Sequence, residues 1–218
     1  MLKANGQHPA APDGHTEQRI LDAAHAVFLR RGTAGARMQE IADEAGVNKA
    51  LLHYYFRSKS RLADAVFGRV VGQLLPPVLE ILGSDLEIED KVRRVVALEL
   101  EHLARNPYAP AYVVSELIQH PERVRQFIKT ITGIDVGRVA PPVRDTLDRQ
   151  LRARARAGTL RPIPAEQFVV NLLGLCLFPF IARPMISAAL QMDEKRFAQF
   201  IEYRKKELAA FFLAALRP

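Results

Sequence analysis

Cysteine is almost absent from this chain of 218 residues, since Cys176 is the only one. An intrachain disulfide is therefore excluded, which suits a reducing cytosol. Long apolar runs are also missing. The longest, residues 168–182, is interrupted by Asn171 and Pro179 and falls short of the ~20 residues that span a bilayer. We expect no membrane partner.

Metal-ligand spacings, phosphate-binding loops and nucleophile motifs are missing as well. The sequence thus predicts no cofactor, no metal site and no catalytic residues. Acidic residues are outnumbered, with 24 against 31 basic ones, and the net charge is +7. This balance favours a polyanionic partner, although charge alone does not distinguish nucleic acid from an anionic membrane surface.

The N-terminal segment, residues 1–14, is polar and rich in proline and alanine, without the apolar core of a signal peptide. We expect a disordered tail here and a cytoplasmic protein. Nearly every later segment has apolar residues at helical spacing with few β-branched alternations, which predicts an all-α fold.

Residues 39–62, QEIADEAGVNKALLHYYFRSKSRL, predict a helix-turn-helix. Ile41 and Ala45 lie on an apolar stripe of the first helix, and Gly46 supplies the positive φ that ends this helix tightly. Asn48 is a good N-cap for the second helix, because its side chain can accept a free backbone N–H. In this motif the second helix lies in the DNA major groove, with its first residues at base edges.

Basic residues around the second helix occur with no acidic residue between them and alternate with aromatic side chains. Cations neutralise phosphates, while Tyr and His donate hydrogen bonds to phosphates or meet base edges. The alternative is a helix pair whose basic residues are solvated and bind nothing. The turn, the cap and the charges, however, all agree with a DNA-binding motif. The predicted DNA-binding residues are Lys49, His53 and Tyr54 near the groove, Arg37, Tyr55 and Lys59 on phosphates, and Asn48 and Ala50 at the helix start, with Leu52 and Phe56 packed beneath.

Residues 15–62 resemble the DNA-binding region of TetR-type transcriptional regulators, on the segments ILDAAHAVFLRRG, IADEAGV and HYYFRSKSRL. The sequence departs from the family pattern at Arg37, where Thr or Ser is common, and at Leu51 and His53, where Thr and Tyr are common. The resemblance implies an N-terminal three-helix DNA-binding domain over 15–62 and a C-terminal helical bundle for ligand binding and dimerisation over 63–218. It also implies a repressor that binds a pseudo-palindromic double-stranded DNA operator as a homodimer and is released by a small-molecule effector.

The predicted helices downstream begin at Lys59, after a cap at Ser58, and Pro76-Pro77 is expected to end or kink the first of them. Gly32 is expected to stop the opening helix, and residues 133–137 to form a break. The last two predicted helices carry enough apolar residues to form a four-helix bundle with their symmetry mates in a dimer, unless they complete a monomeric core. The predicted helix ranges are 16–31, 59–82, 89–105, 108–119, 121–131, 142–157, 164–190 and 193–216.

Polar or aromatic groups within otherwise apolar helices are the candidates for effector contacts. Each also has a structural interpretation, as a surface residue, a pair across the dimer or an ordinary core aromatic. The mixture favours a largely hydrophobic molecule with one polar end. Cys176 has only apolar sequence neighbours and is expected to be an inert buried thiol. The candidate effector residues are His102, Tyr108, Tyr112, Glu116, Asn171 and Phe178.

Two other functions compete with a ligand sensor. An enzyme that carries a DNA-binding module could use His102 with Glu99 or Glu101 as an acid–base pair. An architectural DNA-binding protein would sense no ligand. A buried cavity of ligand size in the second domain would favour the sensor, whereas a fully packed core would favour the architectural protein. In a sensor, we expect the helix from Lys59 to transmit ligand binding to the DNA-reading domain.

Overall fold

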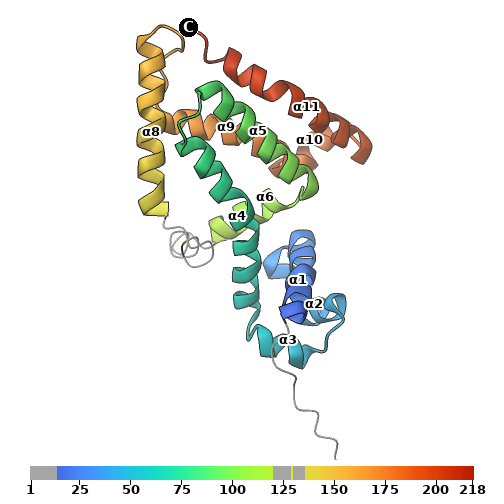
Figure 1. The fold of residues 1–218 in the computed structure, drawn as a ribbon. Helices are drawn as coiled ribbons and strands as arrows, with labels where there is room; N and C mark the ends of the chain where they lie inside the picture. The colour runs from blue at the N-terminus through green and yellow to red at the C-terminus, as the bar shows by residue number, and fades with distance from the viewer. Residues whose placement is uncertain (1–13, 120–128, 130–135) are drawn as a thin grey trace, which may run out of the picture. The chain divides into compact units, whose positions relative to one another are not determined.

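The computed structural model describes residues 14–119, 129 and 136–218, and within these ranges the chain forms helices and no strands (Figure 1). The predicted all-α fold is thus confirmed. The chain divides into two compact units, Met1–Val66 and Phe67–Pro218. The predicted tail up to residue 13, the predicted helix over 121–131 apart from residue 129, and the first three residues of the predicted break at 133–137 lie outside the described residues.

The first unit contains α1 (Gly14–Gly35), α2 (Met38–Ala45), α3 (Lys49–Tyr55) and the start of α4 (Lys59–Gly83). Gly32 interrupts α1 with φ 67° and ψ 164°, so the predicted helix stop is confirmed. Small and branched side chains from all four helices fill one core. The largest buried contributors to this core are Ile20, Val27, Phe28, Ile41, Leu52, Phe56, Leu62 and Val66.

Among the described residues, the second unit contains the rest of α4 and six further helices: α5 (Ile88–Arg105), α6 (Ala109–Gln119), α8 (Val136–Arg156), α9 (Ala165–Ile181), α10 (Arg183–Ala189) and α11 (Glu194–Ala214). Helix α5 lies at its centre, because α9 and α11 both pack along it (Figure 1). Apolar residues on several sides of α5 account for this central place. Its buried apolar residues are Ile88, Val92, Val95, Val96, Leu100 and Leu103.

Proline positions account for the main differences from the predicted helices. The helix does not end at Pro76-Pro77, since α4 continues to Gly83 with both prolines inside it. Buried Val78 and Leu82 hold the residues beyond the prolines in the core and offset the two missing backbone hydrogen bonds. Likewise, α8 begins at Val136 rather than near residue 142, because proline fixes a φ that a helix accepts.

A second difference concerns the predicted single helix over 164–190. It is two helices, α9 and α10, which are bent by 69° at Ala182. Pro184, in the first turn of α10, has no N–H to donate to the Phe180 carbonyl. The break therefore follows from a proline that the apolar pattern had masked.

Helix α4 is held at its C-terminal end by a buried lysine. The ammonium of Lys91 donates to the Leu82 carbonyl oxygen at 2.6 Å and to Gln150 Oε1 at 2.7 Å, so one side chain of α5 ties α4 to α8. Burial lowers the pKa of Lys91.

By length and composition α4 could cross a membrane, as core helices of globular proteins also could, and its Val70, Val78 and Leu82 are buried in protein.

Candidate nucleic-acid interface and cavity

The turn between α2 and α3 is closed by backbone hydrogen bonds around Gly46. This glycine has φ 63° and ψ 37°, and its N–H points at the Ala42 and Asp43 carbonyl oxygens. The Val47 N–H donates to the Ala42 carbonyl oxygen at 3.0 Å, which completes a Schellman motif at the C-terminus of α2. The predicted role of Gly46 is confirmed.

Helix α3 begins at the predicted cap. The side chain of Asn48 accepts a hydrogen bond of 2.7 Å from the Leu51 N–H. Leu52 is fully buried and Phe56 is 7% exposed, so both pack beneath the helix as predicted. Capping and packing together fix which face of α3 is left open.

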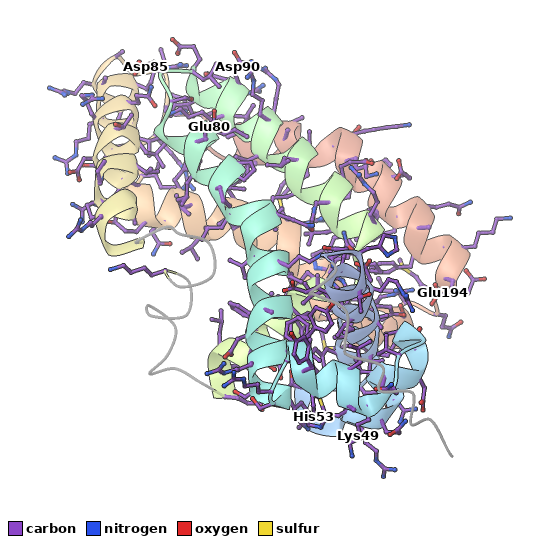
Figure 2. All side chains as sticks on the ribbon, turned by 60° about the horizontal axis from the view of Figure 1, so that its bottom comes forward. Lys49, His53, Glu80, Asp85, Asp90 and Glu194 are labelled. Carbon is purple, nitrogen blue, oxygen red and sulfur yellow. The ribbon has the colours of Figure 1, made fainter. Side chains whose placement is uncertain are left out.

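The open face of α3 carries four of the predicted DNA-binding residues. Lys49, Ala50 and His53 are exposed, and Tyr54 is 52% exposed. Figure 2 shows Lys49 and His53 at the outer edge of α3. Tyr55 is half-buried, and its ring meets that of Tyr54 edge-on, with centroids 5.6 Å apart. The arrangement offers cationic and hydrogen-bonding groups along one short helix.

The remaining predicted contacts flank this helix. Arg37 is exposed at the start of α2, where it makes no side-chain cap. Lys59 is half-buried, and its ammonium donates to the Ala34 and Ala36 carbonyl oxygens, each at 3.2 Å. An ammonium has three donors, so one of them remains for a phosphate. The sequence predicted only a phosphate contact for Lys59, whereas its contacts with the Ala34 and Ala36 carbonyl oxygens also hold α4 against the α1–α2 connection.

Within the second unit, helices α4, α5, α6 and α9 line a partly open cavity of about 190 Å³, here called the apolar cavity. Its walls are almost entirely apolar, and among the described residues two of those that line it have ionisable side chains. The apolar cavity is lined by Val70, Val71, Leu74, Leu75 and Val78 of α4, Glu99, His102 and Leu103 of α5, Ala109, Pro110, Val113 and Val114 of α6, and Leu173, Leu177 and Ile181 of α9.

Of the predicted effector residues, the structure brings His102 to the apolar cavity. Tyr112 is buried and packs on Phe67, with ring centroids 6.5 Å apart. Glu116 is buried on α6 but does not line this cavity. The others are exposed and lie outside the cavity lining: Tyr108, Asn171 and Phe178.

Glu99 is the cavity residue that sequence reasoning considered only as a partner of His102. It is 2% exposed, and its Oε2 has no hydrogen-bond partner among the described residues. The signal was present in the sequence, because Glu99 lies at i+7 from Val92 and i+4 from Val95 on a buried stripe. A carboxylate at a core position of a helix is the pattern that identifies it.

Burial sets the protonation of these side chains. Burial raises the pKa of Glu99 from 4.5 to about 7. Burial, helped by Arg105, lowers the pKa of His102, so this imidazole is neutral at neutral pH. The thiol of Cys176 is fully buried, and burial together with Glu99 raises its pKa to about 12. A thiol with this pKa is protonated and unreactive, as predicted.

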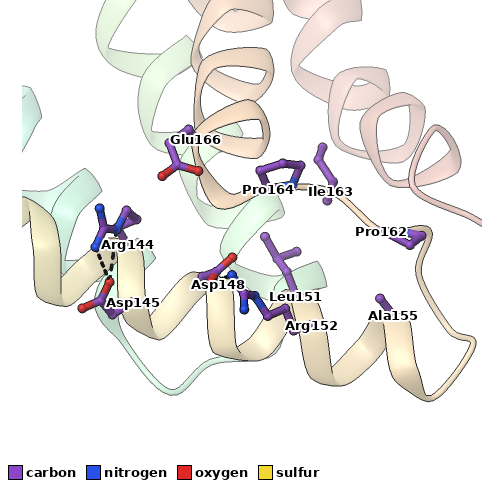
Figure 3. A pocket seen from close by; sticks show the side chains of 10 residues that line it. All are labelled: Arg144, Asp145, Asp148, Leu151, Arg152, Ala155, Pro162, Ile163, Pro164 and Glu166. Atoms are coloured by element: carbon purple, nitrogen blue, oxygen red, sulfur yellow. Dashed lines mark hydrogen bonds and ion pairs between the residues drawn. The ribbon is translucent and has the colours of Figure 1, made fainter.

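A larger surface hollow of about 450 Å³ lies between α8 and the start of α9 (Figure 3). Its charges pair with one another, since Arg144 bonds Asp145 at 2.8 Å and Arg152 bonds Asp148 at 2.7 Å. It has the chemistry of a solvated helix surface. Across the described residues, no group of three or more His, Cys, Asp or Glu side chains is arranged to hold a metal ion.

Comparisons with known families follow this division of the chain. Residues 20–66 match the family described as bacterial regulatory proteins, tetR family. Residues 89–206 match the tetracyclin repressor-like C-terminal domain, which covers more than half of the chain. The first match contains the helix-turn-helix, and the second contains α5 to α10 and most of α11.

Individual relatives are also transcriptional regulators, which are not enzymes. The chain is 38% identical over 85 residues to the transcriptional activator FasR of Mycolicibacterium smegmatis, covering 39% of each chain. It is 26% identical over 181 residues to the transcriptional repressor NicS of Pseudomonas putida, covering 82% of each. The solved structure of HlyIIR, a hemolysin II transcriptional regulator, shares the fold with a TM-score of 0.61 at 23% identity, covering 94% of this chain and 98% of that one.

Proposed function

Because the chain belongs to the TetR family of bacterial regulatory proteins, we propose that it is a ligand-responsive repressor, whose affinity for its operator falls when a small, largely hydrophobic effector occupies the apolar cavity. In this proposal the protein acts on DNA and is cytoplasmic. The apolar cavity is the observation that carries the proposal, because an architectural DNA-binding protein needs no such space in its second domain.

Helix α4 is the proposed link between effector and DNA. Its first turns, which include Lys59 and Leu62, belong to the first unit, and five of its later residues line the apolar cavity. A ligand shifts an equilibrium only by binding one conformation more tightly than another. An effector that favours an α4 position unsuited to DNA binding would therefore lower operator affinity.

In this proposal a homodimer binds the operator, and helices α9, α10 and α11 form the interface between the two protomers. In a symmetric dimer, paired α3 helices reach half-sites about 34–36 Å apart on a pseudo-palindrome. Apolar side chains are exposed on all three helices, and contiguous exposed apolar surface is typical of an interface. These side chains are Val170, Phe178, Met185, Leu190, Tyr203 and Phe211.

The apolar stripe of the last helix fits the alternative in which this helix completes a monomeric core. Phe197, Ile201, Leu208 and Phe212 are buried within their own chain, where α11 packs on α5. They complete the core of one protomer. On α11 the dimer proposal therefore depends on Tyr203 and Phe211, which are 67% and 64% exposed.

The first experiment is binding of the purified protein to DNA from its own upstream region, titrated with salt and competitor DNA. Specific binding that survives competitor supports the regulator and provides an assay for compounds that release DNA. A Val114→Phe variant, which fills the apolar cavity, should keep DNA binding and lose the response to such compounds. Ile118→Phe, at an exposed position of α6 outside the cavity lining, is the control. An effector that released both variants equally would contradict the cavity assignment.

A further inference from the structure

We propose that the apolar cavity selects compact organic cations, that is, apolar molecules with one protonated amine, and that the carboxylate of Glu99 is the group that binds the amine. This inference rests on the proposed function, because it assigns a chemical class to the effector of the same cavity. It is carried by the position of one carboxylate in an otherwise aliphatic enclosure.

One carboxyl oxygen of Glu99, Oε2, has no hydrogen-bond partner among the described residues. Its side chain lines the apolar cavity, the residue is 2% exposed, and Oε2 accepts no hydrogen bond from the described part of the chain. A buried carboxyl that lacks a partner destabilises the folded protein, and more so when it is charged. A ligand that donates hydrogen bonds to Oε2 would remove this cost.

The charged and titratable neighbours of Glu99 leave a cation as the missing partner. His102 on the same helix is neutral, since burial lowers its pKa, and Cys176 on α9 is a protonated thiol. The guanidinium of Arg204 on α11 is engaged elsewhere, donating two hydrogen bonds to the Leu175 carbonyl oxygen at 2.7 and 3.2 Å. Among the described residues, the lining of the apolar cavity contains no lysine or arginine.

An ammonium group matches this enclosure better than a neutral or anionic group. It donates up to three hydrogen bonds and supplies the positive charge that would pair with an ionised Glu99. The attraction between opposite charges is also stronger in an aliphatic surrounding than in water. A ligand carboxylate would meet a like charge, and a neutral acceptor would bind only the protonated form of Glu99.

The size of the apolar cavity limits the rest of the ligand. About 190 Å³ is slightly more than the ~150 Å³ apolar cavities that take up benzene. One ring with a short aminomethyl arm therefore fits, with the ring against Leu74, Val113 and Leu177 and the amine at Glu99. Benzylamine, benzyl alcohol and benzoate share this shape and differ in charge, so they are the probes.

The test is calorimetric binding of the three probes to the full-length protein at a pH of about 7.5. We expect benzylamine to bind about tenfold or more tightly than benzyl alcohol, as a charge-assisted hydrogen bond provides, and benzoate most weakly. Glu99→Gln should remove the preference for the amine and keep binding of the alcohol. Glu116→Gln, which changes a buried carboxyl outside the apolar cavity, should behave like the wild type.

A second measurement detects the proton that Glu99 should release when the amine binds. At a pH of about 6 most Glu99 side chains carry a proton, so binding of the ammonium should release close to one proton per site. The release appears as a dependence of the binding enthalpy on the ionisation enthalpy of the buffer. Glu99→Gln should show no such dependence. Benzylamine that bound the wild type without releasing a proton would overturn the assignment of Glu99.

The outcomes separate this inference from the proposed function. If benzyl alcohol or benzoate binds the wild type as tightly as benzylamine, the cavity takes ligands but the cation preference is wrong. If Glu99→Gln keeps the preference for the amine, Glu99 is not the binding group. If none of the probes binds the wild type, the chemical class is wrong, and the effector cavity is tested only by compounds that release DNA. If a probe binds the wild type and Val114→Phe equally tightly, the cavity assignment itself is wrong.

Discussion

The guanidinium of Arg19 on α1 donates a hydrogen bond of 2.6 Å to the carbonyl oxygen of Ala45, the last residue of α2. The same Nη2 atom lies 3.2 Å from the Gly46 carbonyl oxygen. A cation at the C-terminal end of a helix stabilises carbonyl groups that have no helical partner. The turn that presents α3 is thus held both by its own backbone and by a side chain of α1.

Gly46→Ala should destabilise the first unit. Its φ of 63° is unfavourable for a residue with a Cβ, and that Cβ would lie 3.2 Å from Arg19 Nη2. We expect the free energy of unfolding to fall by about 1–2 kcal/mol. Gly174→Ala is the matched control, because Gly174 lies inside α9 with nothing within 4 Å of an added Cβ, and it should be neutral or stabilising. Urea denaturation measures both, and equal losses in the two variants would contradict the strain at Gly46.

Asn48 allows capping to be separated from DNA contact. Asn48→Ala should lower the free energy of unfolding by about 1 kcal/mol, because the Leu51 N–H loses its acceptor. Asn48→Asp should keep the cap and the stability but weaken DNA binding several-fold, because a carboxylate would face phosphates. Denaturation and fluorescence anisotropy with labelled operator give the two quantities. Unchanged DNA affinity in Asn48→Asp would place this residue away from the DNA.

Lys49 and Lys59 should differ in what their loss changes. Lys59→Ala should weaken binding to all DNA sequences and flatten the slope of log K against log salt by about 1.8 for the proposed dimer, which is about 0.9 for each of two phosphates. It should also cost stability, because two carbonyl contacts are lost. Lys49→Ala should leave stability unchanged and relax sequence preference. Lys206→Ala, exposed on α11, is the control for charge alone. A wild-type salt slope in Lys59→Ala would contradict its phosphate contact.

Glu99 should give the protein a stability that falls as pH rises. Its pKa is about 7 in the folded protein against 4.5 in the unfolded chain, so between these values only the folded state keeps the proton. The free energy of unfolding should therefore decrease from pH 4.5 through about 7, by up to about 3 kcal/mol. Glu99→Gln should remove this decrease. Urea denaturation at about pH 5 and about pH 8 tests it, with Glu116→Gln as the control, and the same pH dependence in Glu99→Gln and the wild type would place its origin elsewhere.

Phe178→Glu and Phe211→Glu should convert the proposed dimer to monomers. Both side chains are more than half exposed, on α9 and α11, and a charge there would be buried on association. Sedimentation velocity measures the change. Ile118→Glu, on α6 at 72% exposure, is the control for adding a charge at an exposed apolar position. Dimers that persist in both phenylalanine variants would place the interface on another surface.

The amino-acid sequence was sufficient for the features that depend on neighbouring residues. Gly46 ends α2, Asn48 caps α3, and Leu52 and Phe56 lie beneath it, as predicted. Turn geometry, capping and helical periodicity act over a few residues, so they can be read directly from the chain. The helix-turn-helix and the all-α fold were therefore predictable.

The tertiary structure decided which side chains meet in the second unit. Of the six predicted effector residues His102 lines the apolar cavity, whereas Glu99 was identified by its burial between helices. Tertiary packing also decided where the long helices break. Pro184 separates α9 from α10. Helix α4 continues through Pro76-Pro77, because the residues beyond these prolines are buried. The sequence by itself thus determined the elements and the DNA-reading helix. Burial, and with it the chemistry of the cavity, depends on packing between distant segments, which no local pattern contains.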